Sequence, residues 1–574
     1  MERLEAKKIN KQTYYYYSVW NWVNGKCRRT FQRYLGKPAD IYNAMQQSPT
    51  PQYAEVFDFG LPIAIWNELE KLKIIEIINK LCPKRNQGMN IGQYLGISAV
   101  NRAVGPASKR GMWEWFQRTA LHRVLPEANR ASLSSQRFWD HMDAVSMDSI
   151  HEIWETIIST CLKQESIGLN DICYDGTNFY TFIDTFNTAC DLPKRGKNKQ
   201  GRCNLRQVSY ALFCTAAERI PLCFDIYPGN RNDCPEFNAM LERFKDFLVR
   251  LGLPLCTDTS LQVTLIFDKG NNSAENINLM DQNSLHFIGS VKLDEHRDLA
   301  AISNKDTRFI SCTDVQLAGI RFIKLEKEIY GKTRTVILCY NPRLFEQQWM
   351  TLNNDIAKAV EALSLLRSKL EDRTNGLIKR GNAPTVDSLR KQVNDILKRP
   401  FLKDIIGVSV INNHIPSLDY TIDTTKLETI ADTHLGKKIV ITTRSDWDAQ
   451  RIIGAYHSQY AIEHVFRNMK DRTTGVWWPM NHWTDQKINI HGLYCTIAML
   501  LRSIIYRRIR QAQIKIPYGR IFSELAEIRE VINVFKATRK GEKRTTTLTK
   551  LSDIQQQLMD VLAIPRKPND VLSV

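Results

Sequence analysis

Residues 263–291, VTLIFDKGNNSAENINLMDQNSLHFIGSV, decide how the middle of this 574-residue chain folds. The apolar run ending at Asp268 predicts a strand, the periodic stretch from Ser273 a helix, and residues 286–291 another strand. Three strands in a meander and a helix precede them, predicted at 171–174, 208–215, 221–227 and 236–251. This order indicates a mixed α/β sheet.

Two of the predicted strands end in an aspartate. Asp175 closes the run ICYD, and Asp268 closes the run LIFD just before Lys269. In a sheet of this order the two strands can be neighbours, which would bring both carboxylates to one edge. Taken alone, an aspartate at a strand end is ordinarily a cap or loop residue, so each is weak evidence for chemistry.

A third acid comes from residues 446–471, DWDAQRIIGAYHSQYAIEHVFRNMKD. Apolar residues at helical intervals predict one long helix, with Asp446 as its candidate N-cap. At about 100° per residue, one stripe roughly 80° wide carries an aromatic, an amide, an acid and two cations. These residues are Tyr456, Gln459, Glu463, Arg467 and Lys470. Such a stripe suggests a polyanion bound around a metal.

Asp175, Asp268 and Glu463 form a candidate catalytic set. Carboxylates without His or Cys are hard oxygen donors, which suit Mg²⁺ or Mn²⁺ rather than zinc. Two such ions, roughly 3.5 to 4 Å apart, activate the attacking oxygen and stabilise the leaving oxygen in phosphodiester transfer.

Composition limits the class of protein. The length predicts three or four domains, and 79 Lys and Arg against 61 Asp and Glu give a net charge of +18. That excess favours binding of nucleic acid, although many cytosolic proteins are mildly basic and bind none. Thirteen cysteines without metal spacing argue against zinc modules and disulfides. A charged N-terminus predicts no signal peptide, and the apolar run 493–501 is too short to span a bilayer, so we expect a cytoplasmic protein with no membrane partner.

The flanking regions are basic. Strand-like runs around Asn24-Gly25 predict a hairpin, either DNA-touching or merely a surface element. Residues 61–165 show helical periodicity with interspersed Arg and Trp, which fits DNA binding or a packed core. Residues 501–550 hold 13 Lys and Arg against 4 Glu, a bias typical of nucleic-acid binding or of a solvated helix face.

Further candidate DNA contacts lie beside the core. A basic loop after the first catalytic strand contains Lys194, Arg195, Lys197, Lys199 and Arg202. Loops like this one track phosphates, with a solvated loop as the alternative. Trp447 is a candidate for stacking on an extruded base, with a core position as the alternative.

Four motifs together resemble the DDE transposases of bacterial insertion sequences. They are YDGTNFY (174–180), IPLCFDIYPGNRND (220–233), IFDKGNNSAENI (266–277) and Tyr456-x2-Gln459-x3-Glu463-x6-Lys470. The resemblance runs from about 167 to 501. It is closest to the subgroup with a ribonuclease-H-like core, a β-rich insertion before the Glu and a Tyr-x2-Arg-x3-Glu-x6-Lys signature.

The resemblance implies roles for particular residues. The acids would bind two divalent ions, with Asp175 shared and Asp268 and Glu463 holding one each. Tyr456 and Lys470 would contact phosphates near the transposon end, and the protein would act as a homodimer on paired ends. One residue departs from the signature, because Gln459 stands where the family has Arg. The amide of Gln459 carries no charge, so we hypothesise that Arg467, one turn past Glu463, supplies the positive charge of the missing arginine.

The expected fold class is α/β, a ribonuclease-H-like mixed sheet interrupted by a mainly β insertion. The expected segments are an N-terminal β-hairpin region, a helical DNA-binding region, the first part of the catalytic core, the insertion, the second part with Glu463 and a helical basic C-terminal region. Their ranges are 1–60, 61–165, 166–292, 293–444, 445–505 and 506–574.

The expected function is transposition of DNA. The protein would cleave double-stranded DNA at terminal inverted repeats and transfer the 3′-OH into target DNA, in a bacterial or archaeal cytoplasm in association with the nucleoid. One alternative is a nuclease on the same core that never joins DNA. The other is a domesticated DNA-binding protein without catalysis.

Overall fold

The computed structural model describes residues 1–23, 25–46, 50–82, 88–197, 201–231, 233–252, 263–283, 285–381, 383–538 and 541–571. By their contacts these residues divide into two compact units. The first unit comprises Met1–Trp66, Gly111–Leu133 and Arg508–Val574, and the second comprises Asn67–Arg110 and Ser134–Arg507. The three candidate acids all belong to the second unit.

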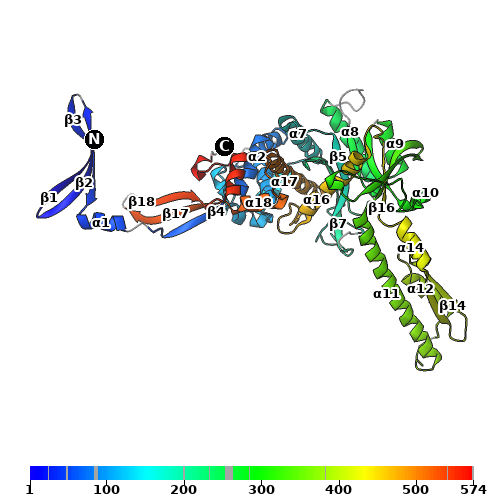
Figure 1. Cartoon of the computed structure of the whole chain (residues 1–574). Coiled ribbons are helices and arrows are strands. Elements are labelled where there is room, and N and C mark those ends of the chain that lie inside the picture. Colours follow the sequence, from blue (N-terminus) through cyan, green and yellow to red (C-terminus); the bar gives the residue numbers. More distant parts are fainter. Residues whose placement is uncertain are drawn as a thin grey trace. The chain divides into compact units, whose positions relative to one another are not determined.

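A mixed ten-stranded sheet forms the core of the second unit (Figure 1). Its order is β11-β12-β13-β16-β10-β9-β5-β7-β6, with β8 also paired to β7. β5, β9 and β10 are parallel neighbours, whereas the other pairs are antiparallel. The strands are β5 (Asp171–Tyr180), β6 (Lys194–Arg195), β7 (Arg206–Thr215), β8 (Pro221–Pro228), β9 (Thr264–Phe267), β10 (His286–Val291), β11 (Ile310–Ser311), β12 (Arg321–Ile329), β13 (Lys332–Tyr340) and β16 (Lys437–Thr442).

Helices cover both faces of this sheet. On one face lies α8 (Asp233–Arg250), whose Phe237 ring centroid is 4.7 Å from that of Tyr174 on β5. On the other lies α17 (Asp485–Gln511), where the Thr496 and Tyr210 hydroxyl oxygens are 2.8 Å apart. α9 (Ala274–Gln282) connects β9 to β10. The predicted mixed α/β sheet is therefore confirmed.

The strand that carries Asp175 is longer than predicted. β5 runs to Tyr180, because β7 pairs with it over its whole length beyond Asp171, including Asp175 opposite Leu212. Asp175 therefore lies inside a strand and not at its end. What ends near Asp175 is the parallel pairing with β9, whose last pair is Tyr174 with Phe267.

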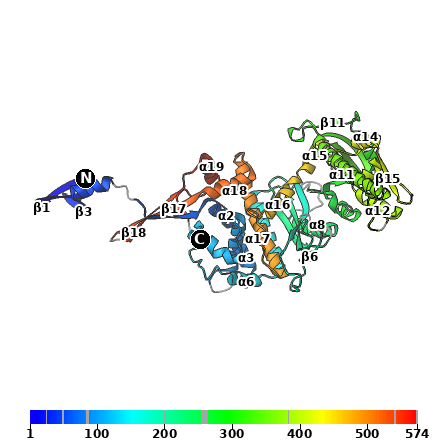
Figure 2. The ribbon, with the colours of Figure 1, turned by 90° about the horizontal axis from the view of Figure 1, so that it is seen from below.

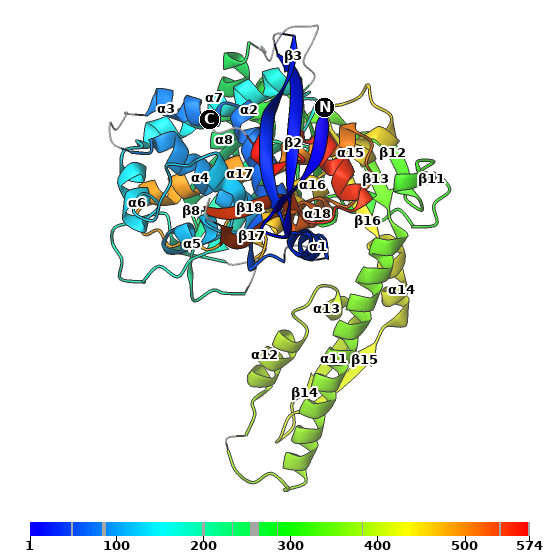
Figure 3. The ribbon, with the colours of Figure 1, turned by 90° about the vertical axis from the view of Figure 1, so that its left-hand side faces the viewer.

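The region predicted as a separate, mainly β insertion differs from that prediction. β12, β13 and β16 join the main sheet, because β16 pairs with β10. Between β13 and β16 the chain is mostly helical, and Figure 3 shows α11 running out from the sheet beside the smaller elements. Leu363, Leu389 and Ile405 are fully buried in the core of this extension. Its elements are α11 (Pro342–Thr374), α12 (Val386–Ile396), α13 (Leu402–Ile405), β14 (Ile406–Ile411), β15 (Ser417–Ile422) and α14 (Thr424–Thr433).

The long helix predicted over 446–471 is broken in two. α15 (Ala449–His457) and α16 (Tyr460–Lys470) are separated by a turn at Ser458 and Gln459. The backbone oxygen of Ser458 accepts a tight i+3 bond from Ala461 and also the thiol of Cys173 on β5. These contacts draw that carbonyl away from a regular helical bond.

Helices before β5 and after α16 complete the second unit. They include α3 (Ile74–Leu81), α4 (Ile91–Val104), α6 (Ser135–Asp143) and α7 (Met147–Glu165). α17 is long and apolar enough to cross a membrane by length and composition alone. Its apolar window is wholly buried in the structure, as in the core helix of a globular domain.

The first unit contains the N-terminal hairpin and the basic C-terminal segment. The predicted hairpin is β2 (Gln12–Val23) with β3 (Lys26–Gly36), and β1 (Glu2–Ile9) adds a third strand. The C-terminal segment is not simply helical as predicted. β17 (Arg529–Thr538) and β18 (Gly541–Leu548) form a hairpin, which lies in sequence between α18 (Tyr518–Glu527) and α19 (Asp553–Val561) (Figure 2). β17 also pairs with β4 (Tyr53–Asp58).

Candidate active site

Asp175 and Asp268 are brought together by the register of two parallel strands. β5 and β9 pair from Asp171 with Thr264 to Tyr174 with Phe267. The next residue on each strand is Asp175 and Asp268. Adjacent strands lie about 4.8 Å apart, so the two backbones place their carboxylates side by side.

Asp175 faces the broken helix. Side chains alternate along a strand, and the residues two positions before and after Asp175 both contact this helix pair. The Cys173 thiol lies 3.6 Å from the carbonyl oxygen of Ser458, and Lys470 donates a hydrogen bond to the Thr177 hydroxyl. Asp175 therefore lies on the face of β5 that α16 covers.

Glu463 projects from α16 as an exposed side chain. It lines a cavity of about 370 Å³ together with Lys438, Tyr456 and Gln459. Burial lowers the pKa of Lys438, while the carboxylates of Asp268 and Glu463 act in the opposite direction. One lysine is thus within electrostatic reach of two of the three acids.

Lys438 is a site residue that the sequence did not reveal. It lies on β16, and its Nζ is 4.4 Å from the centroid of the Tyr456 ring. No motif spacing singled it out, since the sequence shows only a pair of lysines, Lys437 and Lys438, before an apolar run. Its place depends on β16 entering the main sheet, which the sequence analysis did not predict.

Tyr456 contacts an acid. Its side chain is 4% exposed, and the phenol oxygen lies 3.0 Å from Ser290 Oγ and 3.4 Å from Asp268 Oδ1. Burial raises the pKa of Tyr456, which keeps the phenol protonated and able to donate. In this structure the hydroxyl lies between the side chains of Ser290 and Asp268, and its contact with DNA stays a prediction.

The three acids fit a hard cation by donor type, and two of them fit it by position. Carboxylate oxygens are the ligands that Mg²⁺ and Mn²⁺ prefer, and Asp175 and Asp268 are neighbours in register. In the described part of the chain, no three Asp, Glu, His or Cys side chains already form a metal-binding group. Glu463 would complete the set by turning its exposed side chain.

The predicted cations of the signature helix differ in their surroundings. Lys470 is half-buried and bound to Thr177, whereas Arg467 is exposed. Burial lowers the pKa of the neighbouring His464 to about 4, and the charges of Arg219 and Arg467 add to this. Gln459 lies in the turn between the two helices, half-buried in the same cavity as Glu463.

The basic loop is held by local contacts. Lys194 pairs with Asp191 at 3.1 Å, Arg195 donates to the Thr185 hydroxyl at 3.2 Å, and the Arg202 guanidinium lies 4.7 Å from the centroid of the Tyr180 ring. Lys197 gives its carbonyl oxygen to Gln207 at 3.4 Å. Lys199 lies outside the described residues. The structure thus anchors one end of this loop on β5.

Trp447 occupies a packed position. The side chain is 4% exposed, with the guanidinium carbons of Arg451 and Arg444 at 3.7 and 4.9 Å from the ring centroid. Both arginines cover the indole, so its surface is not open to an extruded base. The core alternative fits this position.

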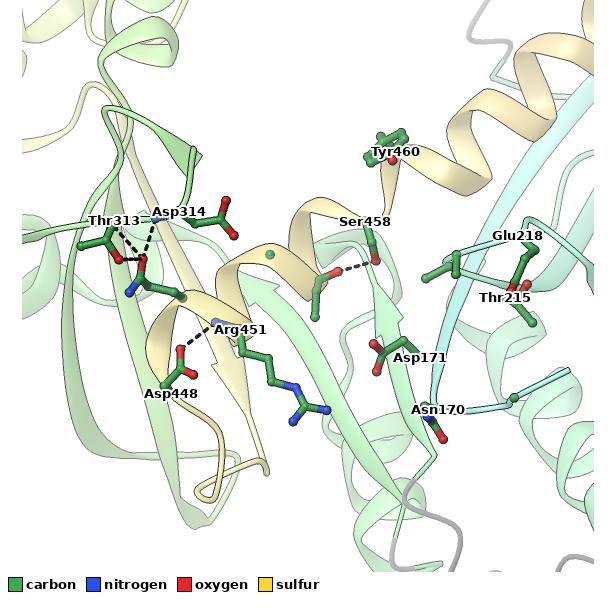
Figure 4. Close-up of a pocket in the computed structure, with 16 residues that line it drawn as sticks. Asn170, Asp171, Thr215, Glu218, Thr313, Asp314, Asp448, Arg451, Ser458 and Tyr460 are labelled. Carbon is green, nitrogen blue, oxygen red and sulfur yellow. Dashed lines mark hydrogen bonds between the residues drawn. The ribbon is translucent and has the colours of Figure 1, made fainter. Parts of the chain in front are cut away.

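A second, larger cleft lies away from the acids. It encloses about 940 Å³ between the start of β5 and α15, and none of the three acids lines it. Figure 4 shows Asp171 and Arg451 among its walls. Burial raises the pKa of Asp171, against the charges of Arg451 and Arg444. Asp171 precedes Asp175 by four residues on the same strand, so this cleft lies toward the start of β5.

The fold and the site define a class of protein, an α/β protein with acids on adjacent parallel strands and a third acid on a later helix. Residues 170–501, more than half of the chain, match the family described as transposase DDE domain. The chain therefore belongs to this family, and the matched range contains Asp175, Asp268 and Glu463. None of the curated proteins matches the sequence.

Among solved structures, the chain is similar to a piggyBac transposase synaptic complex with hairpin DNA, determined by cryo-electron microscopy. The identity is 8%, the TM-score is 0.38, and the match covers 81% of this chain and 79% of the other. At that score the likeness carries no structural argument about this site.

Proposed function

We propose that this protein is a DNA transposase that cleaves double-stranded DNA at terminal inverted repeats and transfers the freed 3′-OH into target DNA. The observation that carries the proposal is the register of β5 and β9. It sets Asp175 beside Asp268 under the helix that bears Glu463. Membership of the transposase DDE family supports the same reaction class.

The three acids would hold divalent ions, Mg²⁺ or Mn²⁺, and two ions are part of the proposal. Ions bound there would activate the attacking oxygen and stabilise the leaving oxygen. The protein side chains have separate tasks. Tyr456 holds the carboxylate of Asp268 in place, and Thr177 orients the ammonium of Lys470 toward the DNA backbone.

A cation near Gln459 would replace the arginine of the family signature. Arg467 remains one candidate, one helical turn beyond Glu463. Lys438 is the second, and it shares a cavity with both Gln459 and Glu463. A charge inside that cavity would lie closer to a phosphate held between the acids, so we favour Lys438.

The decisive experiment is a strand-transfer assay with DNA carrying the element's ends, Mg²⁺ and the full chain. We expect Asp175→Ala, Asp268→Ala and Glu463→Ala each to abolish cleavage and joining and to leave end binding intact. The matched control is Asp171→Asn, on the same strand and outside the proposed site, which should keep full activity.

The outcomes separate the rival functions. Cutting without joining would identify a nuclease, and binding without cutting would identify a DNA-binding protein. Unimpaired joining in any of the three alanine variants would remove that acid from the site. A homodimer on paired ends is part of the proposal, and light scattering of the DNA-bound protein should give two chains per pair of ends.

A further inference from the structure

A pocket of about 500 Å³ lies in the second unit, and none of the three candidate acids lines it. Its walls come from the end of α4 and the segment after it, from α6, and from residues 479–483. None of the described residues that line it carries a carboxylate. The side chains that matter here are Arg102, Lys109, Arg110, Trp139, His482 and Trp483.

Two cations are buried in this pocket. Arg102 is 2% exposed, and its Nη2 donates to the carbonyl oxygen of Pro479 at 2.9 Å. Its Nε and Nη1 are buried and have no hydrogen-bond partner among the residues that the structure describes. Lys109 is 7% exposed, and its Nζ donates to Ser98 Oγ at 2.6 Å. Buried cations are ordinarily paired with an anion, which the protein does not provide among the lining residues.

Aromatic rings compensate for only part of this charge. Nζ of Lys109 lies 4.6 Å from the Phe138 ring centroid and 4.4 Å from that of Tyr494. A ring face attracts a cation but does not accept the N–H bonds of a guanidinium. The unpartnered nitrogens of Arg102 therefore still favour an anionic acceptor in the pocket.

The two tryptophans that line the pocket can hold a planar group. The rings of Trp139 and Trp483 are perpendicular, with centroids 4.9 Å apart. Trp483 is 46% exposed, so one indole surface is open. Arg110 is exposed at the same pocket. An anion beside a free indole face is the arrangement that binds a phosphate and its base together.

We propose that this pocket binds one unpaired nucleotide, with its phosphate toward Arg102 and Lys109 and its base against Trp483. The choice of DNA as the source of that nucleotide rests on the function proposed above. The pocket volume falls within the ordinary range for small-ligand sites. A free nucleotide offers the same chemistry, so the test includes both sources.

Calorimetric titration of the full chain tests the pocket directly, with dTMP and inorganic phosphate as probes. We expect dTMP to bind more tightly than phosphate. Trp483→Ala should lower the affinity for dTMP to that for phosphate. Lys109→Met should lower the affinity for both probes by about tenfold or more. Absence of dTMP binding in the wild type, or unchanged binding in both variants, would overturn the proposal.

Thermal unfolding separates binding from folding. Lys109→Met removes a buried charge that lacks a carboxylate partner, so its Tm without ligand should equal or exceed that of the wild type. The control is Arg334→Met, since Arg334 is equally buried but paired with Asp281 at 2.7 Å. It should lower Tm and leave dTMP affinity unchanged. A large loss of Tm in Lys109→Met would make the lysine structural and count against the proposal.

The DNA arm compares a blunt duplex with one that has a three-nucleotide single-stranded flank. Trp483→Ala and Arg110→Ala, both at exposed positions, should weaken only the flanked duplex. Equal affinity of the wild type for both duplexes would overturn DNA as the source. If the wild type cleaves DNA and the pocket variants bind the flanked duplex as tightly as the wild type does, this inference alone fails. If the wild type binds dTMP but cleaves no DNA, the proposed function alone fails.

Discussion

The phenol oxygen of Tyr456 lies 3.4 Å from Oδ1 of Asp268. The tyrosine belongs to α15 and the aspartate follows β9, so the helix before the turn fixes an acid of the sheet. Ser290 on β10 receives the same hydroxyl at 3.0 Å. Tyr456 is therefore buried against one of the three candidate acids.

Tyr456→Phe removes this contact and keeps the ring. Residues that orient metal ligands affect metal affinity, so we expect the Mg²⁺ concentration for half-maximal cleavage to rise about tenfold or more. End binding without Mg²⁺ should not change. Ser290→Ala is the control and should shift the Mg²⁺ requirement less. An unaltered Mg²⁺ requirement in Tyr456→Phe would show that the hydroxyl does not support Asp268.

Lys438→Gln tests which cation replaces the signature arginine. If the charge in the cavity binds a phosphate, cleavage should fall about tenfold or more, as for the loss of one charge-assisted hydrogen bond. Adding Gln459→Arg in the same chain should restore much of the rate. Arg467→Gln is the comparison, and a larger loss there than in Lys438→Gln would assign the role to Arg467.

Lys470→Ala should weaken binding of end DNA and reduce the salt dependence of binding by about one unit of slope, since one phosphate contact is lost. Thr177→Val keeps the charge but removes the hydroxyl that orients it. That variant should keep the slope and lose cleavage rate. Equal salt slopes in Lys470→Ala and the wild type would place Lys470 away from the phosphates.

Acid should destabilise the second unit through His482. Burial lowers the pKa of His482 to about 3, and Lys109, Arg102 and Lys487 add to this. An unfolded histidine has a pKa near 6.5. Between these values the unfolded chain binds a proton that the folded chain does not, so the free energy of unfolding falls as the pH drops from about 6.5 toward 3.

His482→Gln should reduce this dependence of the free energy of unfolding on pH. His482 faces the Tyr494 hydroxyl at 3.2 Å and the His491 ring, and burial also lowers the pKa of His491, which leaves part of the slope. Tm measured at pH 7, 5.5 and 4.5 gives the comparison. Parallel pH curves for variant and wild type would contradict this account.

Local patterns predicted the elements that carry chemistry. The apolar run before Asp268 and the run around Asp175 appear as adjacent strands, and β10 has its predicted bounds, because buried parallel strands need continuous apolar side chains. Glu463 lies on a helix as expected. The sheet order that makes Asp175 and Asp268 neighbours follows from the same strand-helix-strand alternation.

Long-range pairing escaped prediction. The carbonyl oxygen of Ser458 at the helix break contacts Cys173, 285 residues away, which no local periodicity reveals. Lys438 reaches the acids only because β16 pairs with β10. In both places a distant strand decides the outcome, and sequence spacing within one segment carries no information about it.

The pairing of β4 with β17 has a consequence for biosynthesis. Residues 53–58 and 529–534 are adjacent strands of one sheet, so the early strand waits for its neighbour until nearly the whole chain has left the ribosome. The second unit ends at Arg507 and has all its strands before that point. A chain whose translation halts after Arg507 should therefore keep every strand of the second unit and lose β17, the partner of β4.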